Sequence, residues 1–148
     1  MTLREWAAQH PEEIITEEAS RTAVPALVAV VAREIADAEG VPSDDGRLEH
    51  AFAACVAAAR AALCACGYRI RSRAHHYLAI ESLQYTLGLC SEELHRLQTY
   101  RRMRARTMYD QVGIASREDA QAALAAAKAV ASRLTAWLAQ EHSDLLPR

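Results

Sequence analysis

Four arginines fall within six positions of this sequence, and a tyrosine follows them. The stretch runs from Tyr100 to Asp110, and its arginines are Arg101, Arg102, Arg104 and Arg106. A guanidinium group is always charged and presents a planar set of donors that matches the oxygens of a phosphate. The stretch therefore predicts oriented binding of an anion such as phosphate. The alternative interpretation is a solvated helix surface, because arginine favours helices and its stem covers apolar neighbours.

Two neighbouring histidines and a further arginine lie upstream of this stretch. Arg73 belongs to a basic connector, and His75 and His76 open the helix that follows. Successive residues of a helix point about 100° apart, so at most one of the two histidines is expected to face a given site. For each of them, a surface position or a buried, hydrogen-bonded imidazole competes with a role in catalysis.

The charge of the chain is unevenly distributed. The formal net charge is −2 at pH 7, but eight arginines and three glutamates between Arg69 and Arg106 give this segment a charge of +5, and the remainder carries −7. An acidic protein does not coat nucleic acid with its whole surface. The local basic zone instead predicts that a phosphate-bearing partner is met at one place.

Hydrophobic periodicity predicts the helices that position these residues. Of all residues 51% are hydrophobic but only 5% are aromatic, which favours helices packed through small side chains. Apolar residues step by three and four from Leu48 to Cys66 and predict a helix, ended by Gly67, in the middle of a bundle. The helix before it is expected to start near Thr22 or Ala23, with Gly40 just past its end as a left-handed cap.

Shorter signals place the remaining elements. They predict a short helix over Leu3–Gln9 anchored by Trp6, a helix over His75–Leu87, the arginine-bearing helix capped by Ser91, and a last helix opened by Ser116. No run of residues alternates like a strand. The basic segment Arg69–Arg73 is interpreted as a connector, because five residues without a partner strand cannot form a sheet. The predicted fold is an all-α, up-and-down bundle of four to five main helices in one domain, 1–148, with residues 1–20 as an N-terminal extension.

Cysteine spacing and hydropathy exclude several classes of site. Cys64 and Cys66 are separated by one residue, which does not fit a zinc knuckle, and no second pair matches them, so buried thiols are expected and no metal or other cofactor. No stretch approaches the roughly 20 apolar residues of a membrane span, and the start of the chain lacks the apolar core of a signal peptide. We therefore expect a cytoplasmic protein with no membrane partner.

The segment from Arg104 to Tyr109 resembles the motif of the HEPN superfamily of small helical-bundle proteins, an arginine followed after four to six residues by a histidine at the end of a helix. The similarity extends over roughly residues 20 to 146. It includes Cys66-Gly67-Tyr68, Arg73-Ala74-His75-His76-Tyr77, Tyr85-Thr86-Leu87-Gly88, Tyr100-Arg101-Arg102 and the closing helix to Trp137-Leu138.

This resemblance implies a homodimer and a set of candidate catalytic residues. Ribonucleases of the family act as dimers without metal, and their arginine and histidine pairs meet in a cleft between protomers. Arg104 then matches the motif arginine, which binds the scissile phosphate and offsets charge in the transition state. Tyr109 stands where the histidine belongs, and a phenol with a pKa near 10 is a poor general base. The motif also departs at Ala105 and at Gln111, where some relatives have a tyrosine that partner nucleotidyltransferases modify.

Three functions follow from these observations. A metal-independent endoribonuclease of toxin or defence type would use Arg104 with Tyr109 or His76 as catalytic residues. A homodimer with weak or no catalysis would bind RNA, a nucleotide or a protein partner such as a nucleotidyltransferase through its arginine cluster at the dimer cleft. In a purely structural dimer, the arginines would pair with glutamates of the same bundle or cross the dimer interface. The missing histidine favours the second function, for which the candidate binding residues are Arg101, Arg102, Arg106, Arg73 and His75.

Overall fold

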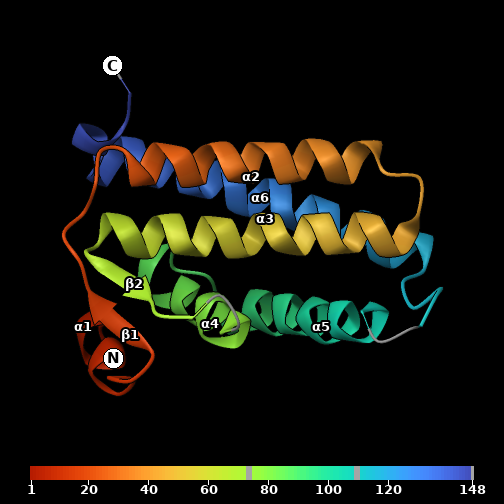
Figure 1. Ribbon diagram of the computed structural model, residues 1–148, viewed down its shortest axis with the longest axis horizontal. Helices are drawn as coiled ribbons and strands as arrows, with labels where there is room; N and C mark the ends of the chain where they lie inside the picture. Colours follow the sequence, from red (N-terminus) through yellow and green to blue (C-terminus); the bar gives the residue numbers. More distant parts are fainter. Residues whose placement is uncertain (73–74, 109–110, 148) are drawn as a thin grey trace.

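The protein is a bundle of helices with one very small sheet at its side (Figure 1). The computed structural model describes residues 1–72, 75–108 and 111–147. The elements in these ranges are α1 (Leu3–Ala8), β1 (Ile14–Thr16), α2 (Ala23–Gly40), α3 (Asp44–Ala65), β2 (Tyr68–Ile70), α4 (His76–Thr86), α5 (Ser91–Thr107), α6 (Arg117–Glu141) and a 3₁₀ helix (Ser143–Leu145). The all-α bundle predicted from the sequence is confirmed.

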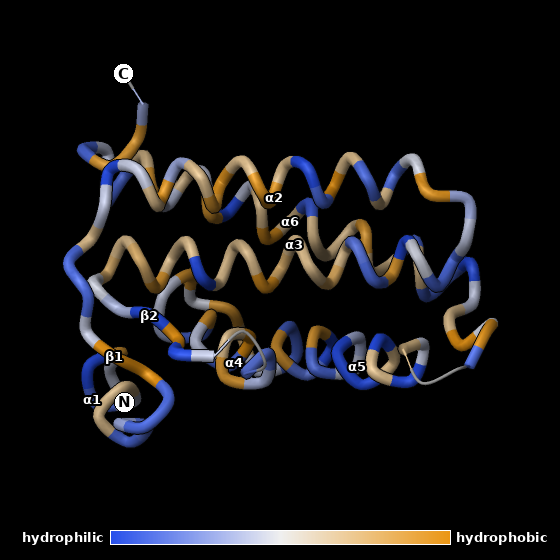
Figure 2. The backbone as a smooth tube through the Cα atoms, viewed as in Figure 1, coloured by the Kyte–Doolittle hydropathy of each residue, from blue (hydrophilic) through white to orange (hydrophobic). Residues whose placement is uncertain are grey.

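The helix α3 lies at the centre of the bundle. It runs between α2 on one side and the α4–α5 pair on the other, with α6 behind it (Figure 1). Most of its residues from Leu48 to Ala65 are buried, and Ala58, Ala59 and Ala62 are completely so. Small side chains allow neighbouring helices to approach closely, as the alanine-rich sequence predicted. In Figure 2 α3 is coloured mainly as apolar, whereas α5 is largely hydrophilic.

The composition of α3 differs from the expectation that no segment of the chain is apolar enough to span a membrane. By length and composition α3 would suffice to cross a bilayer, although the sequence was expected to contain no such stretch. Of its most apolar window, however, 72% is buried inside the protein. An apolar helix surrounded by other helices is a core element, so its composition reflects packing in this bundle.

Most predicted helix ends are found where the sequence placed them. Gly67 and Gly88 have φ values of +88° and +71°, and each follows a helix as a left-handed stop. Ser116 opens α6, and its Oγ accepts a hydrogen bond from the amide of Asp119 at 3.0 Å. Two predictions were wrong: Gly40 is the last residue of α2 without a positive φ, and Cys90, not Ser91, is the N-cap of α5.

A two-stranded antiparallel sheet replaces the basic connector. In it β2 pairs with β1, with Ile14 opposite Ile70 and Thr16 opposite Tyr68. The interpretation of Arg69–Arg73 as a connector was therefore wrong for the first residues of that segment. Its partner strand has three residues, which is too short to show alternation, and it comes from the N-terminal extension more than 50 positions away. The extension itself is anchored by Trp6, as predicted, which is 1% exposed and lies against the rings of His10 and Tyr85.

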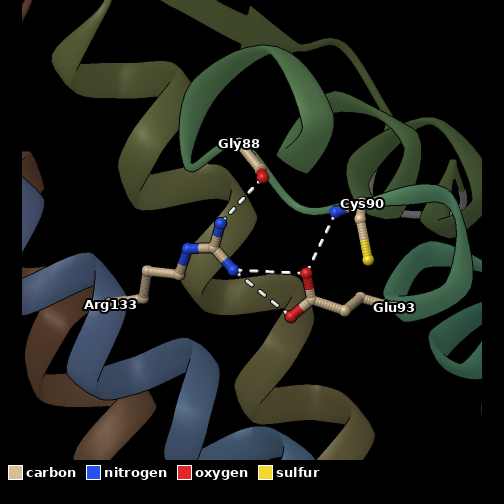
Figure 3. Close-up of polar contacts among 4 residues, drawn as sticks. All are labelled: Gly88, Cys90, Glu93 and Arg133. Carbon is tan, nitrogen blue, oxygen red and sulfur yellow. Dashed lines mark hydrogen bonds and ion pairs between the residues drawn. The ribbon is translucent and has the colours of Figure 1, made fainter.

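Two polar networks hold α5 and α6 in place. Arg133 of α6 donates to the carbonyl of Gly88 at 2.7 Å and to both carboxylate oxygens of Glu93 at 3.2–3.3 Å (Figure 3). The hydrogen bond from the Cys90 amide, and then Arg133, hold the pKa of Glu93 below its usual value. In the segment just before α6, the amides of Gly113 and Ala115 donate to the Asp45 carboxylate of α3 at 2.7 and 2.9 Å. The first network therefore ties the start of the arginine-bearing helix to α6, and the second ties the segment before α6 to α3.

Candidate functional site

A row of hollows extends from β2, over α3 between α2 and the α4–α5 pair, onto α4 and α5 themselves. It consists of three adjoining hollows of about 450, 570 and 320 Å³, which we call the central, lateral and strand-side hollows of the α3 groove. His76 and Arg104 line both the central and the lateral hollow, and Leu27 and Arg60 line both the central and the strand-side hollow. Neighbouring hollows share side chains, so the three adjoin one another.

The central hollow combines an apolar floor with a basic rim. Residues of α2, α3, α4 and α5 line it: Leu27, Val30, Arg33, Glu34, Phe52, Ala53, Val56, Ala57, Arg60, His76 and Arg104. Phe52, Val56 and Ala57 are buried and form the floor. The lining residues include three arginines and one carboxylate, that of Glu34. The hollow therefore carries a net positive charge that favours an anionic ligand.

The four clustered arginines point in two directions. Arg101 and Arg104 are one turn apart on α5, and both line the lateral hollow together with Ala105 and Met108. Arg102 and Arg106 are exposed and line none of the three hollows of the groove. Positions three or four apart share a helix face, and this periodicity separates the cluster into two pairs. Of the four, only Arg104 reaches the central hollow.

No ion pair engages these four arginines within residues 1–72, 75–108 and 111–147. Arg102 donates to the hydroxyl of Thr99 at 3.2 Å, and Arg101 donates to the amide oxygen of Gln98 at 2.7 Å. A structural role, in which the arginines pair with glutamates of the same bundle or cross a dimer interface, would be favoured by carboxylates at all four arginines and by the absence of an open cleft. The described part of the chain shows neither.

His76 is placed beside Arg104 by the start of α4. It is the first residue of that helix, and its ring meets the ring of Phe52 edge-on, at 5.8 Å and 69°. Phe52 is 1% exposed, so its position is fixed by the core. The imidazole and the guanidinium that line the same two hollows thus come from different helices, and the imidazole rests against a buried aromatic ring.

His75 and Arg101 belong to the lateral hollow alone. His75 is the N-cap of α4 and is half-buried, so the two neighbouring histidines line one hollow and only His76 also reaches the central one. The guanidinium of Arg101 lies 5.5 Å from the ring centre of Tyr77, which is 51% exposed. A cation over an exposed ring offers a flat surface on which a planar ligand can stack.

The strand-side hollow extends the groove to β2. Arg60, Arg69 and Arg71 line it, together with Cys64 and Tyr68. The Nε atom of Arg69 pairs with a carboxylate oxygen of Glu17 at 3.0 Å, and both side chains are about half exposed. An exposed pair of this kind is held weakly, and Arg69 therefore contributes to the positive charge of this end of the groove.

Two predicted site residues, Arg73 and Tyr109, lie outside the described residues. On an unbroken ideal helix, positions 104 and 109 would point to different sides. The helix α5 ends at Thr107, with Met108 as its C-cap, and so it stops between the two positions. The geometry of an ideal helix therefore does not apply to this pair.

Sequence reasoning missed three residues of the central hollow. Arg60 could have been found, because it is the single charged residue between Ala51 and Cys66 in the most apolar helix of the chain. A charge placed there is costly unless it lies at a surface or against a partner. Arg33 and Glu34 carry no such signal, since charged residues are common in the second half of α2.

Two of the four cysteines are kept protonated by burial. Burial raises the pKa of Cys55 to about 12 and that of Cys66 to about 11, so both remain thiols at neutral pH. All four cysteines are free. Only Cys55 is fully buried, and Cys90 is exposed, so the prediction of buried thiols was wrong for Cys90.

Comparison with known proteins gives no assignment of this site. No protein-family model, no curated protein and no solved structure matches the chain. The resemblance to HEPN proteins stays a prediction, and the chemistry of the α3 groove has to be judged from its own residues.

Proposed function

We propose that this protein binds RNA or a nucleotide through its phosphates in the α3 groove. The observation that carries the proposal is the position of Arg104, which lines the central hollow together with Arg60 and His76. In the described part of the chain the guanidinium of Arg104 forms no ion pair. Guanidinium groups bind phosphate oxygens through paired, charge-assisted hydrogen bonds. The apolar floor and the exposed Tyr77 ring provide surfaces for a base or a sugar.

Phosphate binding of this kind depends strongly on salt. Each contact between an arginine and a single-stranded phosphate releases a counterion and contributes roughly −0.7 to the slope of log K against log salt. A charge-assisted hydrogen bond contributes about 1.5–3 kcal/mol, which corresponds to a 10- to 100-fold change in affinity. The loss of one arginine is therefore visible both in the affinity and in the slope.

Replacing Arg104 by glutamine is expected to weaken binding at least about tenfold and to reduce the salt slope by roughly 0.7. The measurement is fluorescence anisotropy of labelled single-stranded RNA and of labelled ATP over a range of salt concentrations. Light scattering on the same samples gives the mass of the binding species, which the resemblance predicts to be a homodimer.

Arg102→Gln is the matched control, because Arg102 is an exposed arginine of the same helix that lines none of the groove hollows. It should leave both affinity and slope nearly unchanged. Equal losses in the two variants, or binding that ignores salt, would show that the α3 groove is not the binding site.

The second candidate function is a metal-independent endoribonuclease. It is favoured by one observation, that His76 and Arg104 line the same two hollows. In this reaction His76 takes the proton of a ribose 2′-hydroxyl, whose oxygen attacks the neighbouring phosphorus. The bond from phosphorus to the 5′-oxygen breaks, and this oxygen takes a proton from solvent water, so the products are a 2′,3′-cyclic phosphate and a 5′-hydroxyl. Arg104 offsets the negative charge that grows on the phosphate.

Cleavage of labelled tRNA or total RNA in the presence of a chelator tests this candidate. The general base of such a reaction contributes about 10²- to 10⁴-fold, so His76→Gln is expected to lower the cleavage rate by that factor. His95→Gln is the control, since His95 is exposed on α5 and lines none of the hollows. Binding without any cleavage by the unaltered protein would leave the first function and remove the second.

A further inference from the structure

Three side chains with metal-ligand chemistry meet where the end of α2 packs on the start of α3. Glu34 and Asp37 lie three residues apart on α2, and His50 faces them from α3. One donor atom of each lies within 4.8 Å of those of the other two. Ligands at about 2.0–2.2 Å from a tetrahedral ion lie roughly 3.4 Å from one another. The three donors therefore have to approach each other by no more than about 1.4 Å, which side-chain rotation can supply.

The backbone around this cluster is held firmly. Ser43 caps α3 by accepting a hydrogen bond from the amide of Gly46 at 3.0 Å. Arg47 of α3 donates to the carbonyls of Ala38 and Val41 at 3.0 and 3.3 Å, which joins the first turn of α3 to the last turn of α2. The elements that carry the ligands are thus fixed relative to each other before any ion binds, and little entropy is lost on binding.

The contacts that Glu34, Asp37 and His50 make in the structure leave them able to bind a cation. One oxygen of Glu34 pairs with Arg33 at 3.2 Å, and the other accepts from Nδ1 of His50 at 2.8 Å. The Arg33 side chain is 63% exposed, and an exposed pair of this kind is worth little. His50 is 35% exposed and Asp37 is exposed as well, so an ion can enter from solvent and keep a water ligand.

The donor set selects the class of ion. Mg²⁺ and Ca²⁺ prefer sites made of oxygen atoms, whereas an imidazole nitrogen suits Zn²⁺ and other divalent transition metals. Two carboxylates also balance the charge of a divalent ion. We propose that Glu34, Asp37 and His50 bind a divalent transition-metal ion, with Zn²⁺ preferred over Mg²⁺, and that the ion joins α2 to α3. This site does not depend on the phosphate binding proposed above.

Isothermal titration of the full-length, chelator-treated protein with ZnCl₂ and then with MgCl₂ tests the site. We expect one Zn²⁺ per chain and no heat with Mg²⁺. Asp37→Asn and His50→Gln should each weaken Zn²⁺ binding at least about tenfold. Zn²⁺ at a hundredfold excess over its Kd should raise the Tm of the unaltered protein by about 5–10 °C.

Two controls separate this site from other acidic residues and imidazoles. Glu39→Gln removes an exposed carboxylate of the same helix that pairs with Lys128, and His95→Gln removes an exposed histidine of α5. Both variants should bind Zn²⁺ like the unaltered protein. If His50→Gln fails to fold, Asp37→Asn decides, because Asp37 is exposed and its replacement leaves the core intact.

Co²⁺ used in place of Zn²⁺ reports which residues bind the ion. Binding by nitrogen and oxygen ligands gives visible absorption bands without the near-ultraviolet charge-transfer bands of cobalt thiolates. Thiolate bands would place the ion on Cys64, Cys66 or Cys90 and overturn the proposal. Absence of Zn²⁺ binding, or binding that is unchanged in both Asp37→Asn and His50→Gln, would overturn it as well.

Discussion

Replacing Phe52 by alanine is expected to lower the free energy of unfolding by about 3–5 kcal/mol. Phe52 is 1% exposed, and its ring forms both part of the core and the floor beneath His76. The substitution leaves a cavity under the groove and removes the edge-on contact between the two rings, which is worth about 0.5–1.5 kcal/mol of the total. Urea unfolding followed by circular dichroism measures the change.

The expected loss is large in relation to the about 5–15 kcal/mol that stabilise an ordinary domain. Phe52→Leu keeps most of the volume and should cost no more than about 1.5 kcal/mol. Val112→Ala is a surface control, because Val112 is 94% exposed, and it should change stability by less than about 0.5 kcal/mol. A loss below about 1 kcal/mol for Phe52→Ala would contradict the placement of this ring in the core.

Ala58→Glu is expected to destabilise the protein by about 3–5 kcal/mol or to prevent folding. Ala58 is completely buried in the middle of α3. A carboxylate there loses its hydration without gaining a partner. Chemical unfolding, or the yield of folded protein, measures the effect.

Ala53→Glu is the matched substitution on the same helix. Ala53 is half-buried and lines the central hollow, where Arg33, Arg60 and Arg104 also lie, so we expect a change of no more than about 1 kcal/mol. Comparison of Ala58→Glu with Ala53→Glu also tests whether α3 is the core helix of a bundle. A core helix with one open side tolerates the charge at Ala53 alone, whereas a helix surrounded by lipid would be destabilised at both positions. Equal losses of stability in Ala58→Glu and Ala53→Glu would contradict the helical bundle.

The helices of this protein could be predicted from the sequence because their signals are local. The steps of three and four residues from Leu48 to Cys66 define one face of a helix without reference to the rest of the chain. The left-handed glycines Gly67 and Gly88 and the capping serine Ser116 act within a single turn. Where local alternatives are nearly equal, as for Cys90 and Ser91, the sequence placed the cap one residue away from its position in the structure.

The sheet and the groove depended on contacts between distant segments. The strand β2 exists because Ile14–Thr16 folds back against it, and three residues are too few to reveal that pairing. Sequence reasoning selected Arg104 and His76 but treated Arg101, Arg102, Arg104 and Arg106 as one cluster. The structure places only Arg101 and Arg104 of these beside the groove.

By itself the sequence determined an all-α bundle with an apolar central helix and an arginine-rich helix near its surface. The tertiary structure decided which charged residues meet, bringing Arg60 of α3 to Arg104 of α5, and Glu34 of α2 to His50 of α3. Periodicity fixes the direction in which a side chain leaves its own helix. The distance between side chains on different helices is set by how the alanine-rich core packs, and that requires all the helices at once.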